Sequence, residues 1–200
     1  MQSVCEHHTV IGPNANKAAF VAANTEAVDL SNAASRAMRE ERFDESISLH
    51  QQALALKLRA YPETSIQAAI SLNGLGEALL RGNRLQEADE AFEKAIAVRE
   101  SGGPRIDAAV TRDNIGALRE AQQRFPEARE VRLRGQGSNE IMCGNPKCSM
   151  NRMCALSQLQ ACAACRSVFY CSRKCQAKDW TSRHKPLCQA NTAQAATAGA

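Results

Sequence analysis

The segment LGEALLRGNRLQEADEAFEKAIAVRE, residues 75–100, predicts two helices joined by a tight turn. Its central motif, Arg84-Leu85-Gln86-Glu87-Ala88, recurs 42 residues earlier as RFDES (42–46) and 40 residues later as RFPEA (124–128). Two further pairs repeat at the same offsets: Pro62 with Pro104, and Gly76 with Gly116. Because these landmarks recur in step, the sequence predicts three units, each a helix, a tight turn, a second helix and a loop.

Small and apolar residues recur in these units at the spacing of one helical face. The stripes consist of Leu30, Ala34, Ala37 and Met38, and of Ala69, Leu72, Gly76 and Leu79. They predict first helices over about residues 26–40, 64–81 and 105–122, and a short last helix that stops at Gly135. We expect His50 on a helix surface.

The composition of the flanking segments predicts the domain boundaries. Residues 1–24 have no sustained period and are predicted as a flexible arm, with a short helix near residues 17–23, before a repeat domain over 25–134. The run GQGSN, residues 135–139, predicts a flexible linker over 135–142. A separate finger is predicted over 143–188, and the small, weakly polar residues 189–200 are predicted to be a disordered tail.

The repeat pattern resembles tetratricopeptide repeats, in the longer spacing of about 42 residues found in kinesin-light-chain-like arrays. The resemblance implies a mainly α fold, in which stacked helix pairs present a concave surface lined by the first helix of each pair. Asn32, Asn73 and Asp113 recur at offsets of 41 and 40 and are the candidate groove residues, with Asn73 and Asp113 preferred.

Eight of the nine cysteines lie between Cys143 and Cys188; the other is Cys5. The chain is 44% hydrophobic and 23% charged, with no apolar run long enough for a membrane helix and no secretory signal at its start. We therefore expect a protein of the cytoplasm, the nucleus or both. In a reducing compartment, clustered cysteines with a nearby histidine favour metal ligation over disulfides.

The clustered ligands form four pairs: Cys143-x4-Cys148, Cys162-x2-Cys165, Cys171-x3-Cys175 and His184-x3-Cys188. Structural zinc takes four tetrahedral nitrogen or sulfur ligands, so eight ligands predict two Zn²⁺ per chain. A segment this short and poor in large apolar groups needs the metals as its core.

The segment YCSRKCQAKDW followed by HKPLC resembles a MYND-type zinc finger. The resemblance implies a cross-braced arrangement, in which the first and third pairs hold one zinc and the second and fourth pairs hold the other. It also implies that Gln176 and Trp180 bind short proline-rich peptides. The family carries a polar residue after the third ligand, whereas this chain has Ala163, which puts the usual peptide preference in doubt.

One alternative for the first site remains open. The first pair is spaced x4 where x2 is commoner in the family, and Cys154 lies in the long interval before Cys162, so Cys154 is an alternative first-site ligand. We prefer Cys143 and Cys148, because Gly144-Asn145-Pro146 supplies turn residues between them. Cys5 is expected to be a bystander.

The function predicted from the sequence is a zinc-binding adaptor that binds peptide segments of partner proteins and is not an enzyme. No hydrolase, phosphate-loop or zinc-protease motif occurs, and each predicted zinc is fully ligated by protein. The alternative is a nucleic-acid-associated transcriptional co-regulator. The net charge of +4 is mild and the basic residues are scattered, so we expect direct nucleic-acid binding to be the weaker reading.

Overall fold

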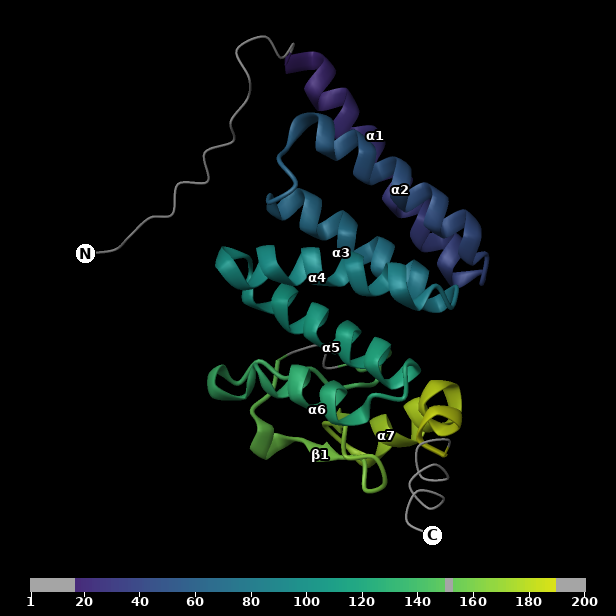
Figure 1. The fold of residues 1–200 in the computed structure, drawn as a ribbon, viewed down its shortest axis with the longest axis vertical. Helices are drawn as coiled ribbons and strands as arrows, with labels where there is room; N and C mark the ends of the chain where they lie inside the picture. Colours follow the sequence, from purple (N-terminus) through teal and green to yellow (C-terminus); the bar gives the residue numbers. More distant parts are fainter. Residues whose placement is uncertain (1–16, 150–152, 190–200) are drawn as a thin grey trace, which may run out of the picture.

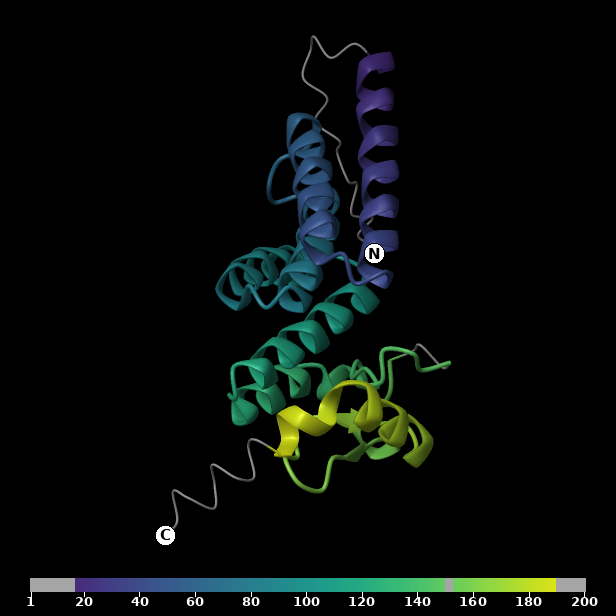
Figure 2. The same cartoon turned by 90° about the vertical axis from the view of Figure 1, so that its right-hand side faces the viewer.

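The computed structural model describes residues 17–149 and 153–189. Six helices stack as three antiparallel pairs, and a small finger follows them at one end of the stack (Figures 1 and 2). The repeat helices are α1 (Lys17–Arg39), α2 (Phe43–Ala60), α3 (Ile66–Arg81), α4 (Leu85–Gly102), α5 (Arg105–Ala121) and α6 (Phe125–Leu133). The predicted mainly α repeat fold followed by a cysteine-rich finger is therefore confirmed.

The chain after α6 consists of short elements. These are the 3₁₀ turns η1 (Gln136–Ser138) and η2 (Leu156–Gln158), strands β1 (Gln160–Ala161) and β2 (Phe169–Tyr170), helix α7 (Arg173–Asp179) and the π-helical turn η3 (Trp180–His184). The two strands pair antiparallel, with Gln160 opposite Tyr170. Among the described helices, none has the length and apolar content that crossing a membrane requires.

The repeated Arg motif marks the same turn in all three units. Glu41, Asn83 and Gln123 each precede the Arg and adopt left-handed backbone conformations, with φ of 59°, 59° and 62°. The backbone N–H of the following Arg bonds to a carbonyl five residues earlier, which satisfies the end of the first helix as in a Schellman motif. The Arg side chain then pairs with the Glu three residues on, an exposed pair that contributes at most about 1 kcal/mol. The backbone turn therefore sets the geometry of each unit.

Small residues let the helices of a pair approach closely. A Cβ at Gly76 would lie 2.6 Å from the ring of Phe92, which is fully buried on α4.

His50, 42 residues before Phe92, is also buried, so the expectation that it lies on a helix surface was wrong. Its ring lies against Gly74 of the next unit, where only a glycine leaves room for it.

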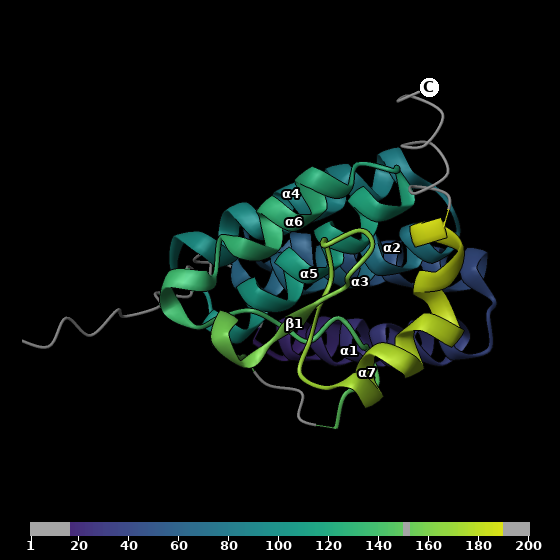
Figure 3. The same ribbon diagram turned by 90° about the horizontal axis from the view of Figure 1, so that it is seen from below.

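The third pair departs from this packing at one position. Arg132 lies 40 residues after Phe92 and occupies the corresponding position in the third pair. A Cβ at Gly116 would lie 2.5 Å from the guanidinium carbon of Arg132, just as a Cβ at Gly76 would contact the ring of Phe92. A cation thus occupies the place of the core aromatic, and it is 3% exposed because the finger covers it. The finger lies across the end of the stack at α5 and α6 (Figure 3).

The structure differs from two predicted boundaries. Helix α1 begins at Lys17, where a short helix over 17–23 was expected within the arm 1–24, but it continues without a break to Arg39. Residues 135–142, predicted as a flexible linker, are packed: Glu140 pairs with Arg105 and Arg112, and Ile141 is 1% exposed. Glycine-rich composition could not reveal this, because the partners that neutralise Glu140 lie 28 and 35 residues away. Residues 1–16, with Cys5, and the tail beyond 189 lie outside the described residues.

Candidate metal centre

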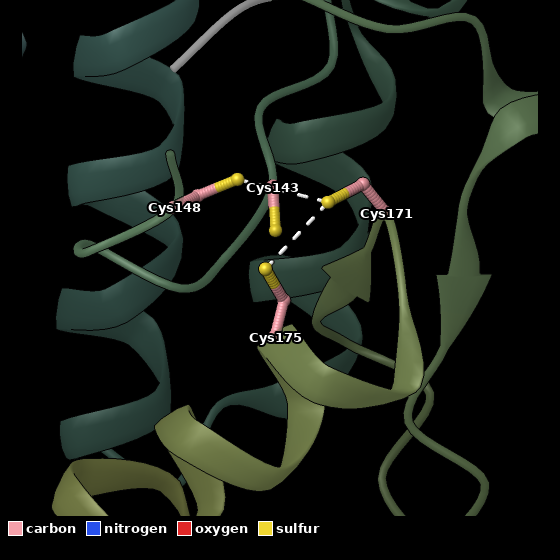
Figure 4. A group of neighbouring side chains, drawn as sticks. All are labelled: Cys143, Cys148, Cys171 and Cys175. Carbon is pink, nitrogen blue, oxygen red and sulfur yellow. Dashed lines mark hydrogen bonds between the residues drawn. The ribbon is translucent and has the colours of Figure 1, made fainter. Parts of the chain in front are cut away.

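Four cysteines converge at the junction of the first finger loop, β2 and α7. The Sγ atoms of Cys143, Cys148, Cys171 and Cys175 all lie within 4.8 Å of one another (Figure 4). Cys171 Sγ is 3.6 Å from that of Cys148 and 3.6 Å from that of Cys175. A tetrahedral zinc with Zn–S bonds of about 2.3 Å places its sulfurs about 3.8 Å apart, so the spacing fits this metal.

Local backbone bonds aim these thiols. Asn145 Oδ1 accepts a bond from the Lys147 N–H at 3.1 Å, and its carbonyl accepts one from the Cys148 N–H at 2.9 Å. Gly144 bonds to the Phe169 carbonyl, in a place where a side chain would overlap Val168. Ser172 caps α7 by accepting from the Cys175 N–H at 3.2 Å. The turn chemistry expected between Cys143 and Cys148 is present.

The second group joins Cys162 and Cys165 to His184 and Cys188, with all four ligand atoms again within 4.8 Å. Cys165 Sγ is 3.3 Å from His184 Nε2, and Cys162 Sγ is 3.9 Å from Cys188 Sγ. The turn after Cys165 places Arg166 at φ 59° and bonds its N–H to the Cys162 carbonyl. His184 and Cys188 lie four residues apart, on one face of the helical segment.

The two groups interleave along the chain as the resemblance implied. The first and third pairs meet in one cluster, and the second and fourth meet in the other. The alternative ligand, Cys154, belongs to neither cluster. It is buried, and its backbone pairs with Ile141 on both sides of an isolated bridge.

The electrostatics of the clusters favour thiolate at two positions. Burial opposes ionisation, but bonds from His184 and Ser167 lower the pKa of Cys165 to about 6. Burial also opposes ionisation at Cys175, where bonds from Asn145 and Ser172 lower the pKa to about 7. Burial raises the pKa of Cys143. Crowded sulfur donors of this kind are compatible with zinc, and each set supplies four protein ligands.

Trp180 lies beside the second cluster, whereas Gln176 directly follows Cys175 of the first cluster on α7. Gln176 is half-buried on α7, and Trp180 is half-buried at the end of that helix. The Trp180 ring meets the His184 ring edge to face, with centroids 5.9 Å apart. Trp180 therefore packs against a candidate ligand and retains part of its surface.

The repeat domain carries a polar network on α3 and α5. Asn114 Nδ2 donates to Glu77 Oε1 at 2.7 Å and to Asn73 Oδ1 at 3.3 Å, and Thr111 donates to the same Asn73 oxygen at 3.0 Å. Asp113, preferred in the sequence, instead binds the Arg132 guanidinium at 2.7 Å. Asn114 lies 41 residues after Asn73, as Asn73 lies 41 after Asn32, so the repeat offset contained the signal for it.

The fold and clusters define a class: helical repeats followed by a Cys/His finger. Residues 25–101 match the family model of the tetratricopeptide repeat, and residues 142–188 match that of the MYND finger. The chain thus combines tetratricopeptide repeats with a MYND finger. Both are non-catalytic classes of domain that generally bind proteins. The repeat match stops before the third pair, in which Arg132 replaces the core aromatic.

A curated relative carries a similar segment. The zinc finger MYND domain-containing protein 10 homolog of Drosophila melanogaster is 36% identical over 62 residues. The match covers 31% of this chain and 12% of that protein. No solved structure matches the chain.

Proposed function

We propose that this protein is an adaptor that holds two structural zinc ions and binds segments of partner proteins with its repeat groove and its finger. The proposal rests on one observation: two groups of four cysteine and histidine ligands lie beside the polar groove of α3 and α5. Free thiols as ligands require a reducing compartment, which is the cytoplasm or the nucleus.

The zinc ions would have a structural role. Cys143, Cys148, Cys171 and Cys175 would hold the first, and Cys162, Cys165, His184 and Cys188 the second. Zinc with four protein ligands stabilises a small domain and has no open position for water or substrate. The finger therefore serves as a rigid platform for recognition.

The groove and the finger offer one continuous surface. A cavity of about 210 Å³ lies where α3 and α5 face the first finger loop, lined by residues that include Glu77, Asn114, Met142 and Pro146. The side-chain amides of Asn73 and Asn114 can bond to the backbone of an extended peptide. A partner segment in the groove would therefore also reach the finger, without a flexible tether between the two domains.

Gln176 and Trp180 form the proposed peptide contact of the finger, with proline-rich segments as the first ligands to test. The exposed part of the Trp180 ring supplies a rigid apolar surface, and Gln176 one turn earlier supplies amide donors and acceptor. Ala163 offers no polar side chain, so the peptide preference depends more heavily on these two residues.

The test is a proline-rich peptide array probed with the intact, zinc-loaded chain. We expect Trp180→Ala to weaken binding by at least about tenfold, as truncation of an aromatic hot spot does, while elemental analysis still finds two zinc ions. Lys178→Ala, an exposed position on the same helix, is the matched control and should change neither value.

Joint loss of peptide binding and zinc in Trp180→Ala would reduce Trp180 to a packing residue and contradict its recognition role. Retention of the intact chain on duplex DNA, weakening steeply with salt, would instead favour the nucleic-acid-associated alternative.

A further inference from the structure

A fully buried carboxylate joins the last repeat to the finger. Glu120 lies on α5 and is 0% exposed. It binds Arg132 of α6, accepts a bond from Arg183 at 2.9 Å and accepts one from the Ser167 hydroxyl at 3.1 Å. Burial alone would raise the pKa of Glu120, but Arg132, His184 and Arg183 lower it well below its usual range. Two guanidinium groups thus face this carboxylate.

The groups around this carboxylate have partners of their own. Arg132 also binds Asp113 at 2.7 Å and the Ser167 carbonyl at 2.9 Å. Arg183 binds Asp179 at 2.8 Å, and Asp179 accepts a bond from the Tyr170 hydroxyl at 2.7 Å. Both arginines would thus keep a carboxylate partner without Glu120, so neutralising them is not its only role.

The orientation of His184 indicates a further role for Glu120. Its Nε2 faces Cys165 at 3.3 Å, inside the second cluster, and its Nδ1 faces Glu120 Oε2 at 3.6 Å. This Nδ1 is buried and lacks a hydrogen-bond partner within the usual limit. A histidine that binds zinc through Nε2 carries its proton on Nδ1, and that proton is usually held by a carboxylate or carbonyl. Glu120 is the carboxylate in position to hold it.

We propose that Glu120 of the repeat domain is the outer partner of the second zinc site, holding the Nδ1–H of His184 and thereby fixing the ring that binds the metal. The inference rests on the proposed occupation of that site by zinc. Its consequence is that the finger completes its second site only when it is docked on α5 and α6. Glu120 is a positioning residue, because it acts through His184.

The test measures zinc release from the intact two-zinc chain into a colorimetric chelator. Loss of an outer-shell partner typically weakens metal binding about 10–100-fold. In Glu120→Gln, in which the anionic acceptor is gone, one of the two ions should therefore leave about 10–100-fold faster and the other at the wild-type rate. Glu140→Gln is the matched control: it removes another nearly buried, arginine-paired carboxylate, and should leave both rates unchanged.

A double variant guards against misfolding. In Glu120→Leu with Arg132→Met, apolar groups of similar volume replace the buried pair, an exchange that often leaves stability unchanged. The acceptor for Nδ1–H is still absent, so the same single ion should leave faster. In zinc-loaded wild type, the ¹⁵N resonance of His184 should report a protonated, hydrogen-bonded Nδ1, and this signature should shift in either variant.

Unchanged release of both ions, equal acceleration of both, or an unmoved Nδ1 signal would overturn the role of Glu120. A wild-type chain that binds fewer than two zinc ions would instead contradict the proposed function itself, so the two failures can be told apart.

Discussion

The repeat domain and the finger reach stable folds by opposite means. The repeats bury alanines, leucines and Phe92 between helices, with glycines such as Gly76 where a ring comes close. The finger packs a few apolar residues, such as Val168 and Tyr170, among its candidate ligands: four of the six residues in its buried cluster are cysteines. Helix packing can be extended unit by unit, whereas a finger of about 46 residues has room for a small core alone, so the proposed metal ions would add to its stability.

The largest effect should follow from removing one thiol of the finger. Cys171→Ser leaves a site of three ligands, and structural zinc contributes about 10–16 kcal/mol in small zinc peptides. We expect elemental analysis to fall from two zinc ions to one and hydrogen exchange to accelerate across the finger, while the circular dichroism of the repeat helices persists.

Cys154→Ser is the matched control for that change, since Cys154 lies outside both clusters. It should keep two zinc ions. If it released as much zinc as Cys171→Ser, the division of the cysteines described above would be wrong.

A smaller effect is expected from one methyl group in the repeats. In Gly76→Ala the new Cβ would lie 2.6 Å from the Phe92 ring, and such overpacking typically costs about 1–3 kcal/mol. Denaturant unfolding should report this loss for the repeat helices, with zinc content unchanged.

Gly102→Ala tests whether space, and not helix propensity, is responsible. A Cβ there would meet nothing within 4 Å, so the change should be neutral or stabilise by up to about 1 kcal/mol. Equal destabilisation by both substitutions would show that the close approach at Gly76 is unimportant.

The smallest effects should come from the same capping device in the two regions. Ser65 accepts from the Ala68 N–H at the start of α3, and Ser172 accepts from the Cys175 N–H at the start of α7. Loss of such a cap costs about 1 kcal/mol. Ser65→Ala should lower the unfolding free energy of the repeats by that amount and leave zinc affinity unchanged.

Ser172→Ala should act on the metal instead, because its cap orients a candidate ligand. A cost of about 1 kcal/mol corresponds to about fivefold weaker zinc binding at the first site, measurable by competition with a chelator. Unaltered zinc affinity would mean that Cys175 is aimed by the metal alone.

Local patterns sufficed for much of this fold. The Arg motif and the offset glycines predicted the helix pairs, because both are requirements of a turn or a close contact within one unit. The ligand pairs predicted the two clusters for a similar reason: each pair is held by one turn or one helical step. The interleaving of the pairs came from the family resemblance and not from spacing.

Residues whose role depends on distant partners were missed. His50 was expected on a surface, and its burial was missed because the residue that makes room for it, Gly74, lies in the next unit. Glu120 gave no signal, since its partners lie 12 to 63 residues further along the chain. The segment 135–142 was predicted to be flexible from composition alone. Peptide recognition by Gln176 and Trp180 stays a prediction.

The interleaved order of the ligand pairs also bears on how the finger forms as the chain is synthesised. The first cluster is complete once Cys175 has emerged from the ribosome, whereas the second waits for Cys188. An ion captured early would close a loop that already contains Cys162 and Cys165, half of the other cluster. The second ion would then bind to a chain segment that the first ion already holds in place. The order of the ligands along the chain would thus set the order in which the two ions bind.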